Sequence, residues 1–287
     1  MRIFVTGGAG FIGTHLCKKL TALHKVTVYD NFSNSNKENF PVMKNLTLIV
    51  GDILDNSHLL DSMKNHDVVI HLAAKTDVVD SVNDPDNTFQ TNVQGTQNVL
   101  NSCQFHNISK IIVTSSAAIY QNSDKPIDET NNLEPLSPYG QSKVNMEKIT
   151  LQSKINYSIL RLFNVYGNGQ TNGVIANFKK NISKNNPLII FGDGNAIRDF
   201  IYIDDVIDAI ILSMESKSGI YNIASGVGTS INDLAKLLVA LSKKNSEIIY
   251  ESARKEEIIF SVANITKSQK ELKFHSKIPL NVGLKIL

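Results

Sequence analysis

Short apolar runs alternate with longer amphipathic stretches along the first half of the chain. Runs rich in β-branched residues, with almost no polar interruption, are typical of strands buried on both faces of a parallel sheet. We expect such strands at Arg2–Thr6, Lys25–Tyr29, Leu46–Val50, Val68–His71, Lys110–Thr114 and Tyr157–Arg161. The stretches between them predict helices at Gly10–Leu23, Asn56–Lys64, Asp86–His106 and Tyr139–Ser153. This alternation predicts a parallel sheet with right-handed crossovers and helices on both faces.

The pattern becomes looser after Arg161. Further helices are expected at Val174–Lys184, Asp204–Met214 and Ile231–Ser242. Further strands are expected at Leu188–Phe191, Phe200–Ile203, Gly219–Ile223 and Glu247–Tyr250. Because the sequence has no internal repeat and no low-complexity linker, we expect a second domain that is interleaved with the first.

The composition excludes several classes of function. Lys+Arg 29 against Asp+Glu 27 leaves a net charge of +2, which argues against nucleic acid as the main partner. Cys17 and Cys103 form no CxxC pair, so we expect no disulfide framework and no metal site. No apolar run approaches the ~18 residues that a membrane span needs. Met1 leads directly into the first strand without a targeting segment, and we therefore expect a cytoplasmic protein with no membrane partner.

Three glycines, Gly7, Gly10 and Gly13, follow the first expected strand and open the first helix. Glycine permits a tight turn, and the helix N-terminus offers N–H groups and the positive end of its dipole to a pyrophosphate. Asp30 ends the second strand, where a carboxylate accepts hydrogen bonds from an adenosine ribose and repels a 2′-phosphate. The pattern therefore predicts a dinucleotide site that takes NAD in preference to NADP.

Asp52 and Ile53, at the end of the third strand, are expected to flank the adenine of the same cofactor. The whole pattern predicts an α/β fold, with a Rossmann-type doubly wound parallel sheet and a smaller, interleaved C-terminal α/β substrate domain. We expect the NAD-binding domain to comprise residues 1–165 and 199–224, and the substrate domain residues 166–198 and 225–287.

Tyr139 and Lys143 have the spacing Tyr-x-x-x-Lys, which places both side chains on one face of a helix. A phenol with a pKa near 10 is a poor base, but a neighbouring cation lowers that pKa. Ser115 and Ser116 end the fifth strand, at the edge of the sheet where ligands bind, and a serine hydroxyl there can hold a substrate oxygen. These residues predict a proton-transfer site in which Tyr139 is the base.

The chain resembles the extended short-chain dehydrogenases/reductases, in particular the NAD-dependent nucleotide-sugar epimerase/dehydratase family, and within it the UDP-glucose 4-epimerases. The matching motifs are Gly7-Gly8-Ala9-Gly10-Phe11-Ile12-Gly13, His71-Leu72-Ala73-Ala74, Asn92-Val93-Gln94-Gly95-Thr96, Ser115-Ser116-Ala117-Ala118-Ile119-Tyr120, Pro138-Tyr139-Gly140-Gln141-Ser142-Lys143, Arg161-Leu162-Phe163-Asn164-Val165-Tyr166-Gly167, Gly192-Asp193-Gly194 and Arg198-Asp199-Phe200. This collinear series covers almost the whole chain and is more specific for the family than for the substrate.

The resemblance implies a role for each matching residue. Tyr139 is the expected base, Lys143 binds the nicotinamide ribose, and Ser116 shares the sugar hydroxyl. The expected NAD contacts are Gly7, Gly10, Phe11, Ile12, Gly13, Asp30, Asn31, Asp52, Ile53, Leu72, Ala73, Ala74, Asn92, Ser115, Tyr139 and Lys143. The expected substrate contacts are Ser116, Tyr139, Asn164, Val174, Arg198, Arg254 and Ser261. Arginine suits a diphosphate because its planar fork donates two hydrogen bonds at once.

Two features depart from the family pattern. The family has an Arg-Pro-Gly-Asp motif near the C-terminus, whereas this chain has Arg254-Lys255-Glu256-Glu257. Glu257 is a candidate substitute for the family's aspartate, and Ser261 then occupies a position that lines the sugar pocket in related epimerases. The chain also stops at Leu287, where the family's last helix is expected to begin.

The resemblance implies 4-epimerisation of a UDP-hexose, either UDP-glucose/UDP-galactose or also the N-acetylated forms. Dehydratases and decarboxylases have acidic residues beside the catalytic serine or threonine, whereas this chain has Ala117 and Ala118 there. The alternatives are a UDP-glucuronate 4-epimerase, a dehydratase, a reductase, or a non-catalytic NAD-binding protein.

The resemblance also implies a homodimer in which the helices at Asp86–His106 and Tyr139–Ser153 pair with those of a second copy. The apolar residues expected at this interface are Val93, Val99, Leu100, Val144, Met146 and Ile149.

Overall fold

The computed structural model describes residues 1–253 and 258–287. It divides into two compact units, each built from three stretches of the chain. The first unit comprises Met1–Tyr120, Asn132–Arg161 and Ala209–Tyr221. The second comprises Gln121–Asn131, Leu162–Asp208 and Asn222–Leu287. The functional domain boundaries expected from the sequence stay a prediction.

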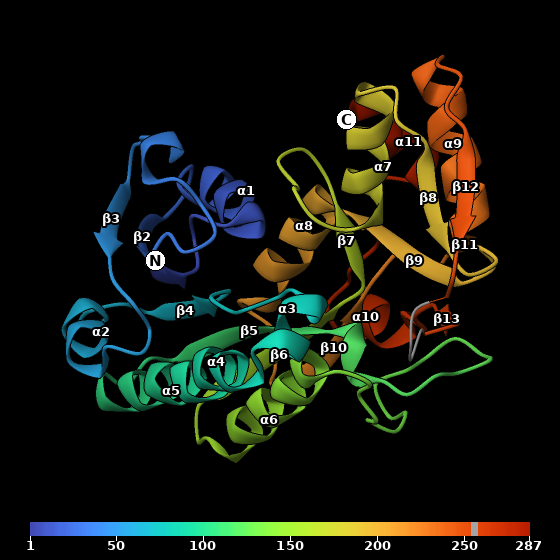
Figure 1. The fold of residues 1–287 in the computed structure, drawn as a ribbon. Helices are drawn as coiled ribbons and strands as arrows, with labels where there is room; N and C mark the ends of the chain where they lie inside the picture. Colours follow the sequence, from blue (N-terminus) through green and yellow to red (C-terminus); the bar gives the residue numbers. More distant parts are fainter. Residues whose placement is uncertain (254–257) are drawn as a thin grey trace. The chain divides into compact units, whose positions relative to one another are not determined.

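The first unit is built on a seven-stranded sheet with the order β10-β6-β5-β4-β1-β2-β3 (Figure 1). The strands are β1 Arg2–Thr6, β2 Lys25–Asp30, β3 Leu46–Val50, β4 Val68–His71, β5 Lys110–Ser116, β6 Asn156–Leu162 and β10 Gly219–Ile223. The pairings from β3 through β2, β1 and β4 to β5 are all parallel, so the expected α/β fold is confirmed. The strand order reverses between β1 and β4, and ligands bind at such a switch point in open α/β sheets.

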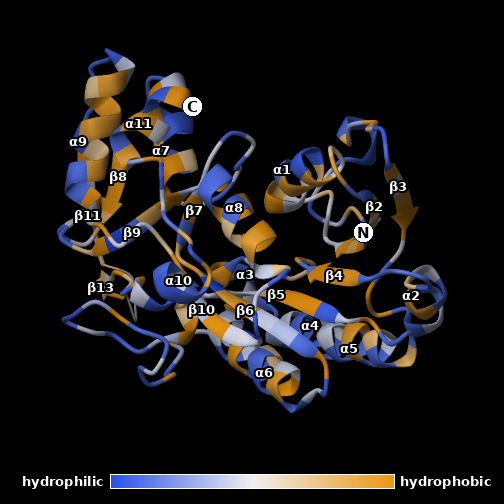
Figure 2. Cartoon of the chain, turned by 180° about the vertical axis from the view of Figure 1, so that it is seen from behind, coloured by the Kyte–Doolittle hydropathy of each residue, from blue (hydrophilic) through white to orange (hydrophobic). Residues whose placement is uncertain are grey.

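Helices cover both faces of this sheet. Those of the first unit are α1 Phe11–Leu20, α2 Asn56–Ser62, α3 Val78–Asn83, α4 Pro85–Phe89, α5 Gly95–Phe105 and α6 Pro138–Gln152. Buried side chains of α2, α5 and α6 join those of the strands in one core, to which Leu59, Val99 and Met146 contribute. Figure 1 shows α5 and α6 beneath the sheet and α1 above it. Figure 2 shows the strands between these layers as largely hydrophobic, as burial on both faces requires.

The helix expected at Asp86–His106 is not continuous. It consists of α4, a π-helical turn at Gln90–Gln94 and then α5. A π turn inserts an extra residue into a helix and is frequent at functional sites. Here it carries Asn92, whose amide is hydrogen-bonded outside its own helix to the main chain of Lys75.

Three of the six residues expected at a homodimer interface lie in the core of their own unit. Val99, Leu100 and Met146 are at most 1% exposed because they face the sheet, so they cannot contact a second copy. Ile149 also packs against this core. Val93 and Val144 are half-buried.

The second unit contains two smaller sheets. In the first, β9 Ile197–Tyr202 lies between β11 Gly228–Ser230 and β13 Phe260–Ser261 and also pairs with β7 Asn164–Tyr166. In the second, β8 Leu188–Phe191 pairs with β12 Ile248–Glu251. The helices are α7 Val174–Ser183, α9 Ile231–Ser242, α10 Thr266–Glu271 and α11 Leu280–Ile286, while α8 Ile203–Ser213 runs from this unit into the first.

Within the described residues, none of the helices combines the length and the apolar character needed to span a bilayer. The strand expected at Phe200–Ile203 begins earlier, at Ile197, because β9 pairs there with both β11 and β13. The 3-10 turns at Lys37–Asn39 and Ala117–Ile119 were not expected from the periodicity.

Candidate functional site

The glycine loop lies at the carboxyl end of β1, where Gly7 has a positive φ of 69°. A Cβ atom on Gly7 would lie 2.5 Å from the amide nitrogen of Ala73, which follows β4. A Cβ atom on Gly13 would lie 2.5 Å from the carbonyl oxygen of Gly7. Only glycine therefore allows the loop, the first turn of α1 and the end of β4 to approach so closely.

The first turn of α1 is suited to an anion. Gly10 is the N-cap residue and provides no side-chain hydrogen bond to the helix, and no acidic residue occupies the first turn. Phe11 and Ile12 follow at the first two helical positions. Main-chain N–H groups and the positive end of the dipole therefore face the position that the sequence predicts for a pyrophosphate.

Asp30 is 8% exposed and lies beside this loop. Its Oδ2 accepts a hydrogen bond from the Ala9 N–H at 2.9 Å, and its Oδ1 accepts one from the Phe32 N–H at 2.7 Å. The two bonds fix the carboxylate and tie it to the glycine loop. Because a carboxylate offers about four acceptor positions, Asp30 can still accept hydrogen bonds from a ribose.

The ends of β2 and β3 are linked by a side-chain contact. Asn31 donates from Nδ2 to Asp52 Oδ2 at 2.8 Å, and Asp52 Oδ1 accepts from the Leu54 N–H. Ile53 is 5% exposed, because its side chain belongs to the core beneath α5. Of these residues, Asn31 and Asp52 present polar groups near the sheet edge, whereas the Ile53 carbonyl already accepts a hydrogen bond from Asn98 Nδ2 at 3.0 Å.

Asn92 is completely buried and joins three elements. Its Oδ1 accepts from the Lys75 N–H at 2.8 Å, and its Nδ2 donates to the Lys75 carbonyl and to Ser142 Oγ, each at 2.9 Å. The amide thereby holds the segment after β4, which includes the half-buried Leu72, Ala73 and Ala74, against α6. The expected contact between Asn92 and NAD stays a prediction, and this geometry favours a positioning role.

A buried chain of hydrogen bonds crosses the sheet at His71. Its Nδ1 lies 2.7 Å from Thr6 Oγ1 and its Nε2 lies 2.9 Å from Thr96 Oγ1. Thr96 donates its hydroxyl proton to the Asn92 carbonyl, so it must accept from His71 Nε2–H. His71 Nδ1 is then the acceptor for the Thr6 hydroxyl. Burial, with a smaller contribution from Lys143, lowers the pKa of His71 to about 3, so the imidazole is neutral.

Ser116 and Tyr139 lie together at the carboxyl end of β5. The Ser116 hydroxyl is hydrogen-bonded to the Tyr139 phenol, and Ser116 Oγ also accepts from the Ala118 N–H at 3.2 Å. Burial raises the pKa of Tyr139, and the Ser116 hydrogen bond opposes this increase. The raised pKa differs from the lowered one that the spacing from Lys143 predicts, because burial of the phenol is the largest influence on it.

Lys143 lies one helical turn after Tyr139, and its Nζ is 5.9 Å from the centre of the Tyr139 ring. The ammonium donates to the Thr114 carbonyl at 3.0 Å and is 3% exposed. Burial lowers the pKa of Lys143 to about 8, and the Glu147 carboxylate opposes this decrease. The ammonium also donates to Met146 Sδ at 3.8 Å, which leaves one N–H group with which it can hold a hydroxyl-bearing ligand.

The start of α6 is held by several hydrogen bonds. Ser137 is the N-cap and accepts from the Gly140 N–H, while Pro138 occupies the first turn, as is usual at a helix start. The Tyr139 N–H donates to Ser81 Oγ of α3 at 3.1 Å. Ser142 Oγ donates to the Tyr139 carbonyl at 2.7 Å.

The residues of the first unit fit a dinucleotide. A Cβ atom at Gly7 or Gly13 would clash with neighbouring main chain, so the loop keeps its backbone bare, and α1 opens without a capping side chain. The Ser115 hydroxyl is buried and has no hydrogen-bond partner among the described residues, although a buried polar group normally has one. A ligand with hydroxyl or amide groups at this edge would satisfy it.

The second unit brings three of the expected substrate residues together. Asn164, Arg198 and Ser261 lie on neighbouring strands, and Ser261 of β13 is paired directly with Arg198 of β9. Asn164 Nδ2 donates to the Asp199 carbonyl at 3.0 Å, which fixes its side chain against β9. Val174 is the half-buried first residue of α7. Arg254 lies outside the described residues.

Asp199, which the sequence analysis did not select, organises this cluster. It is completely buried, and its carboxylate accepts from Ser225 N–H and Oγ–H, from Gly226 N–H and from Ala263 N–H. Backbone N–H groups can only donate, so the carboxylate is the acceptor at both oxygens. It therefore joins β9 to the segments before β11 and after β13. The signal in the sequence that could have identified Asp199 was its position as a charged residue inside a strand-like run.

Ser81 was also missed, because the short helix α3 was not expected. Asp77 caps this helix by accepting from the N–H groups of Val79 and Asp80. An aspartate with an acidic residue three positions later is a recognised start signal. Three valines in six residues concealed it, because they favour a strand.

Comparison with known proteins identifies the family. The model of the NAD dependent epimerase/dehydratase family matches residues 3–224. The chain belongs to this family. The expected class, an NAD-dependent nucleotide-sugar epimerase, is thereby confirmed, and its cofactor is NAD.

Three relatives differ in the substrate they are named for. A putative UDP-glucose 4-epimerase of Methanocaldococcus jannaschii is 38% identical over 99% of this chain and 96% of its own length. A UDP-N-acetylglucosamine 4-epimerase of Methanobrevibacter ruminantium, solved with UDP-N-acetylmuramic acid, is 33% identical with a TM-score of 0.93, covering 99% and 96% of the two chains. A UDP-glucuronic acid 4-epimerase of Bacillus cereus, solved as a variant with a substrate analogue and NAD, is 29% identical with a TM-score of 0.94, covering 100% and 97%.

We expect Gly7→Ala to abolish retention of NAD by the purified protein. The added methyl group would meet the main chain at Ala73, and the positive φ of Gly7 disfavours any side chain. The NAD content should be measured by absorbance after heat release, with the melting temperature recorded beside it. Gly169→Ala is a matched control, because Gly169 also has a positive φ but lies outside the expected cofactor site. Equal NAD content in both variants would contradict the assignment of the glycine loop.

Proposed function

We propose that this protein catalyses the NAD-dependent 4-epimerisation of a UDP-hexose. The observation that carries the proposal is the junction of Ser116, Tyr139 and Lys143 at the carboxyl end of β5, beside the switch point of the sheet. UDP-glucose/UDP-galactose is the proposed substrate pair, and the N-acetylated forms are proposed as a second pair.

The protein residues handle the proton and orient the reacting groups. Ser116 holds the sugar 4-hydroxyl through its own hydroxyl, and Tyr139 removes the proton from that oxygen. Lys143 supplies a positive charge that favours the phenolate and binds the nicotinamide ribose. After the planar 4-keto sugar has turned over, Tyr139 returns the proton to the oxygen.

When bound, NAD would supply reversible hydride transfer at the sugar carbon, with removal from one face and return to the other. Gly7, Gly10 and Gly13 would hold its pyrophosphate, and Asp30 would bind the adenosine ribose. Ser115 would hydrogen-bond a group of the cofactor near the nicotinamide end. Since the cofactor is regenerated in each cycle, we expect the protein to retain it tightly.

The residues after Ser116 favour epimerisation over elimination. Ala117 and Ala118 form the turn after β5, and their methyl groups cannot transfer a second proton. A dehydratase needs a further acid and base at the sugar. In the second unit, Asn164 and Arg198 are proposed to bind the nucleotide and its diphosphate, because amide and guanidinium groups suit those partners. The same role is proposed for Arg254.

We expect Tyr139→Phe to lower kcat by about 10²–10⁴-fold, the range typical of one proton-transfer group. NAD content should stay near that of the wild type, because the ring is retained. The assay follows interconversion of UDP-glucose and UDP-galactose without added cofactor, with UDP-N-acetylglucosamine and UDP-glucuronate in parallel. Stoichiometric NADH production would support a dehydrogenase instead. Turnover of UDP-glucuronate, without turnover of the other nucleotide sugars, would show that UDP-glucuronate is the substrate instead.

We expect Ser261→Tyr to suppress turnover of UDP-N-acetylglucosamine far more than turnover of UDP-glucose. Ser261 is small and 5% exposed, and a tyrosine on β13 beside Arg198 would fill space that a 2-N-acetyl group needs. Ser261→Ala is the control, because it changes the polarity of the side chain with almost no change in volume. Equal loss of both activities in Ser261→Tyr would refute a specificity role.

We further propose that the protein is a homodimer formed through α6 and the stretch that comprises α4, the π turn and α5. Val93 and Val144 are half-buried and support an interface there, in place of the three residues that face the core. We expect sedimentation at micromolar concentration to show a dimer, and Val144→Glu to convert it to a monomer. A monomer for the unmodified protein under the same conditions would exclude this assembly.

A further inference from the structure

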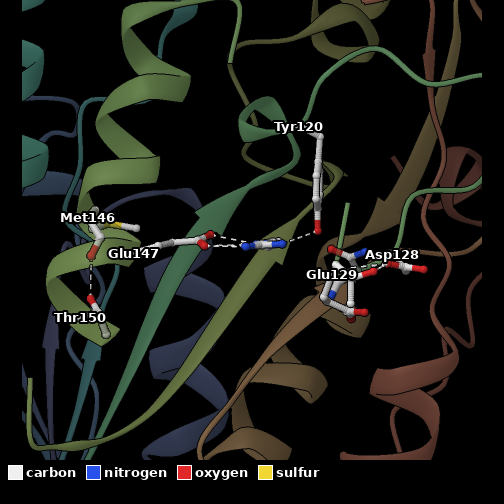
Figure 3. A network of polar contacts seen from close by, with 9 residues as sticks. Tyr120, Asp128, Glu129, Met146, Glu147 and Thr150 are labelled. Atoms are coloured by element: carbon white, nitrogen blue, oxygen red, sulfur yellow. Dashed lines mark hydrogen bonds and ion pairs between the residues drawn. The ribbon is translucent and has the colours of Figure 1, made fainter. Parts of the chain in front are cut away.

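A buried arginine connects the catalytic helix with the segment that follows the catalytic serine. Arg161 of β6 donates from Nη2 to Glu147 Oε2 at 2.7 Å and from Nε to Glu147 Oε1 at 3.0 Å. Its Nη1 donates to the Tyr120 hydroxyl at 2.8 Å. Figure 3 shows this chain of contacts running from Glu147 through the guanidinium to Tyr120. All three residues are at most 2% exposed.

Both ends of this chain belong to elements that carry catalytic groups. Glu147 lies on α6, one turn after Lys143 and two turns after Tyr139, so the three share a helix face. Tyr120 is the C-cap residue of the 3-10 turn Ala117–Ile119, whose N-cap is Ser116. The guanidinium therefore connects α6 to the far end of the turn that begins at the serine.

We propose that Arg161 is a positioning residue for catalysis, which holds Ser116 in register with Tyr139 by bridging Tyr120 and Glu147. The proposal rests on the proposed function, because it assigns Arg161 to the geometry of that reaction. In this proposal Arg161 acts through the two elements that it joins and not directly on the substrate or the cofactor.

The form of the contact argues for positioning rather than for stability alone. A buried ion pair is often no more stabilising than apolar residues of similar volume. The guanidinium fork, however, fixes direction, because Nε and Nη2 both donate to the Glu147 carboxylate while Nη1 donates to the Tyr120 hydroxyl. Glu147 also favours the charged form of Lys143, since its carboxylate opposes the effect of burial on the pKa of that lysine.

The decisive variant is Tyr120→Phe, which removes only the hydroxyl at one end of the bridge. We expect kcat to fall about tenfold, the equivalent of one lost hydrogen bond, with KM and NAD content unchanged. Arg161→Lys keeps the charge but cannot form the fork, and we expect a larger fall in kcat. Tyr221→Phe is the matched control, because Tyr221 is also buried but its hydroxyl is hydrogen-bonded to Lys217, next to β10. It should leave kcat unchanged.

A second measurement does not depend on activity. The ¹³Cζ chemical shift of Tyr139 reports hydrogen bonding of its phenol. We expect this chemical shift to differ from the wild-type value in the holoenzyme of the Tyr120→Phe variant but not in that of the Tyr221→Phe variant. An unchanged Tyr139 shift together with unchanged kcat in Tyr120→Phe would overturn the proposal, and so would equal effects of the two Tyr→Phe variants. If the wild type turned over no nucleotide sugar, the proposed function would fail, and the chemical shift alone would decide the role of Arg161.

Discussion

The position of the first turn of α6 is the constraint on which the catalytic geometry depends. This turn carries Tyr139, and its place is set by hydrogen bonds from buried hydroxyl and amide groups that come from other elements. Ser81 of α3 accepts from the Tyr139 N–H, and Asn92 of the π turn donates to Ser142. A buried polar group without its partner costs about 1–3 kcal/mol, so these contacts strongly favour one position of the helix.

The sequence predicted the elements that are long and apolar. The runs at β1 and β4 have the expected bounds, because a strand covered on both faces must be apolar almost throughout. The run at β3 also has the expected bounds, although this strand is at the edge of the sheet and partly exposed. In the second unit, β8 and β12 were found within one residue, but the shortest strands could not be found in this way. β13 has two residues and β7 has three, which is too few to show a periodicity. Both strands form because they pair with β9.

The candidate site was predictable where its chemistry depends on local spacing, as at Gly7 and Gly13 or at Tyr139 and Lys143. It was not predictable where residues meet across the sheet. Asp199 draws its four donors from segments distant in the sequence, and no local pattern indicates them. The shift in the pKa of Tyr139 was not predictable either, because burial in the folded chain determines its direction.

The direction of the buried hydrogen bonds among Thr96, His71 and Thr6 bears on the charge of His71, which lies near Lys143. The Thr96 hydroxyl proton is committed to the Asn92 carbonyl, so Thr96 can only accept from His71, which leaves Nδ1 of the imidazole as an acceptor. A second proton on His71 would require the Thr6 hydroxyl to change from donor to acceptor. It would also place a second cation near Lys143, whose positive charge lowers the pKa of His71. Burial keeps the imidazole neutral, and the hydrogen bonds of the two threonines suit this neutral form. Lys143, charged below about pH 8, can then act as the cation beside Tyr139.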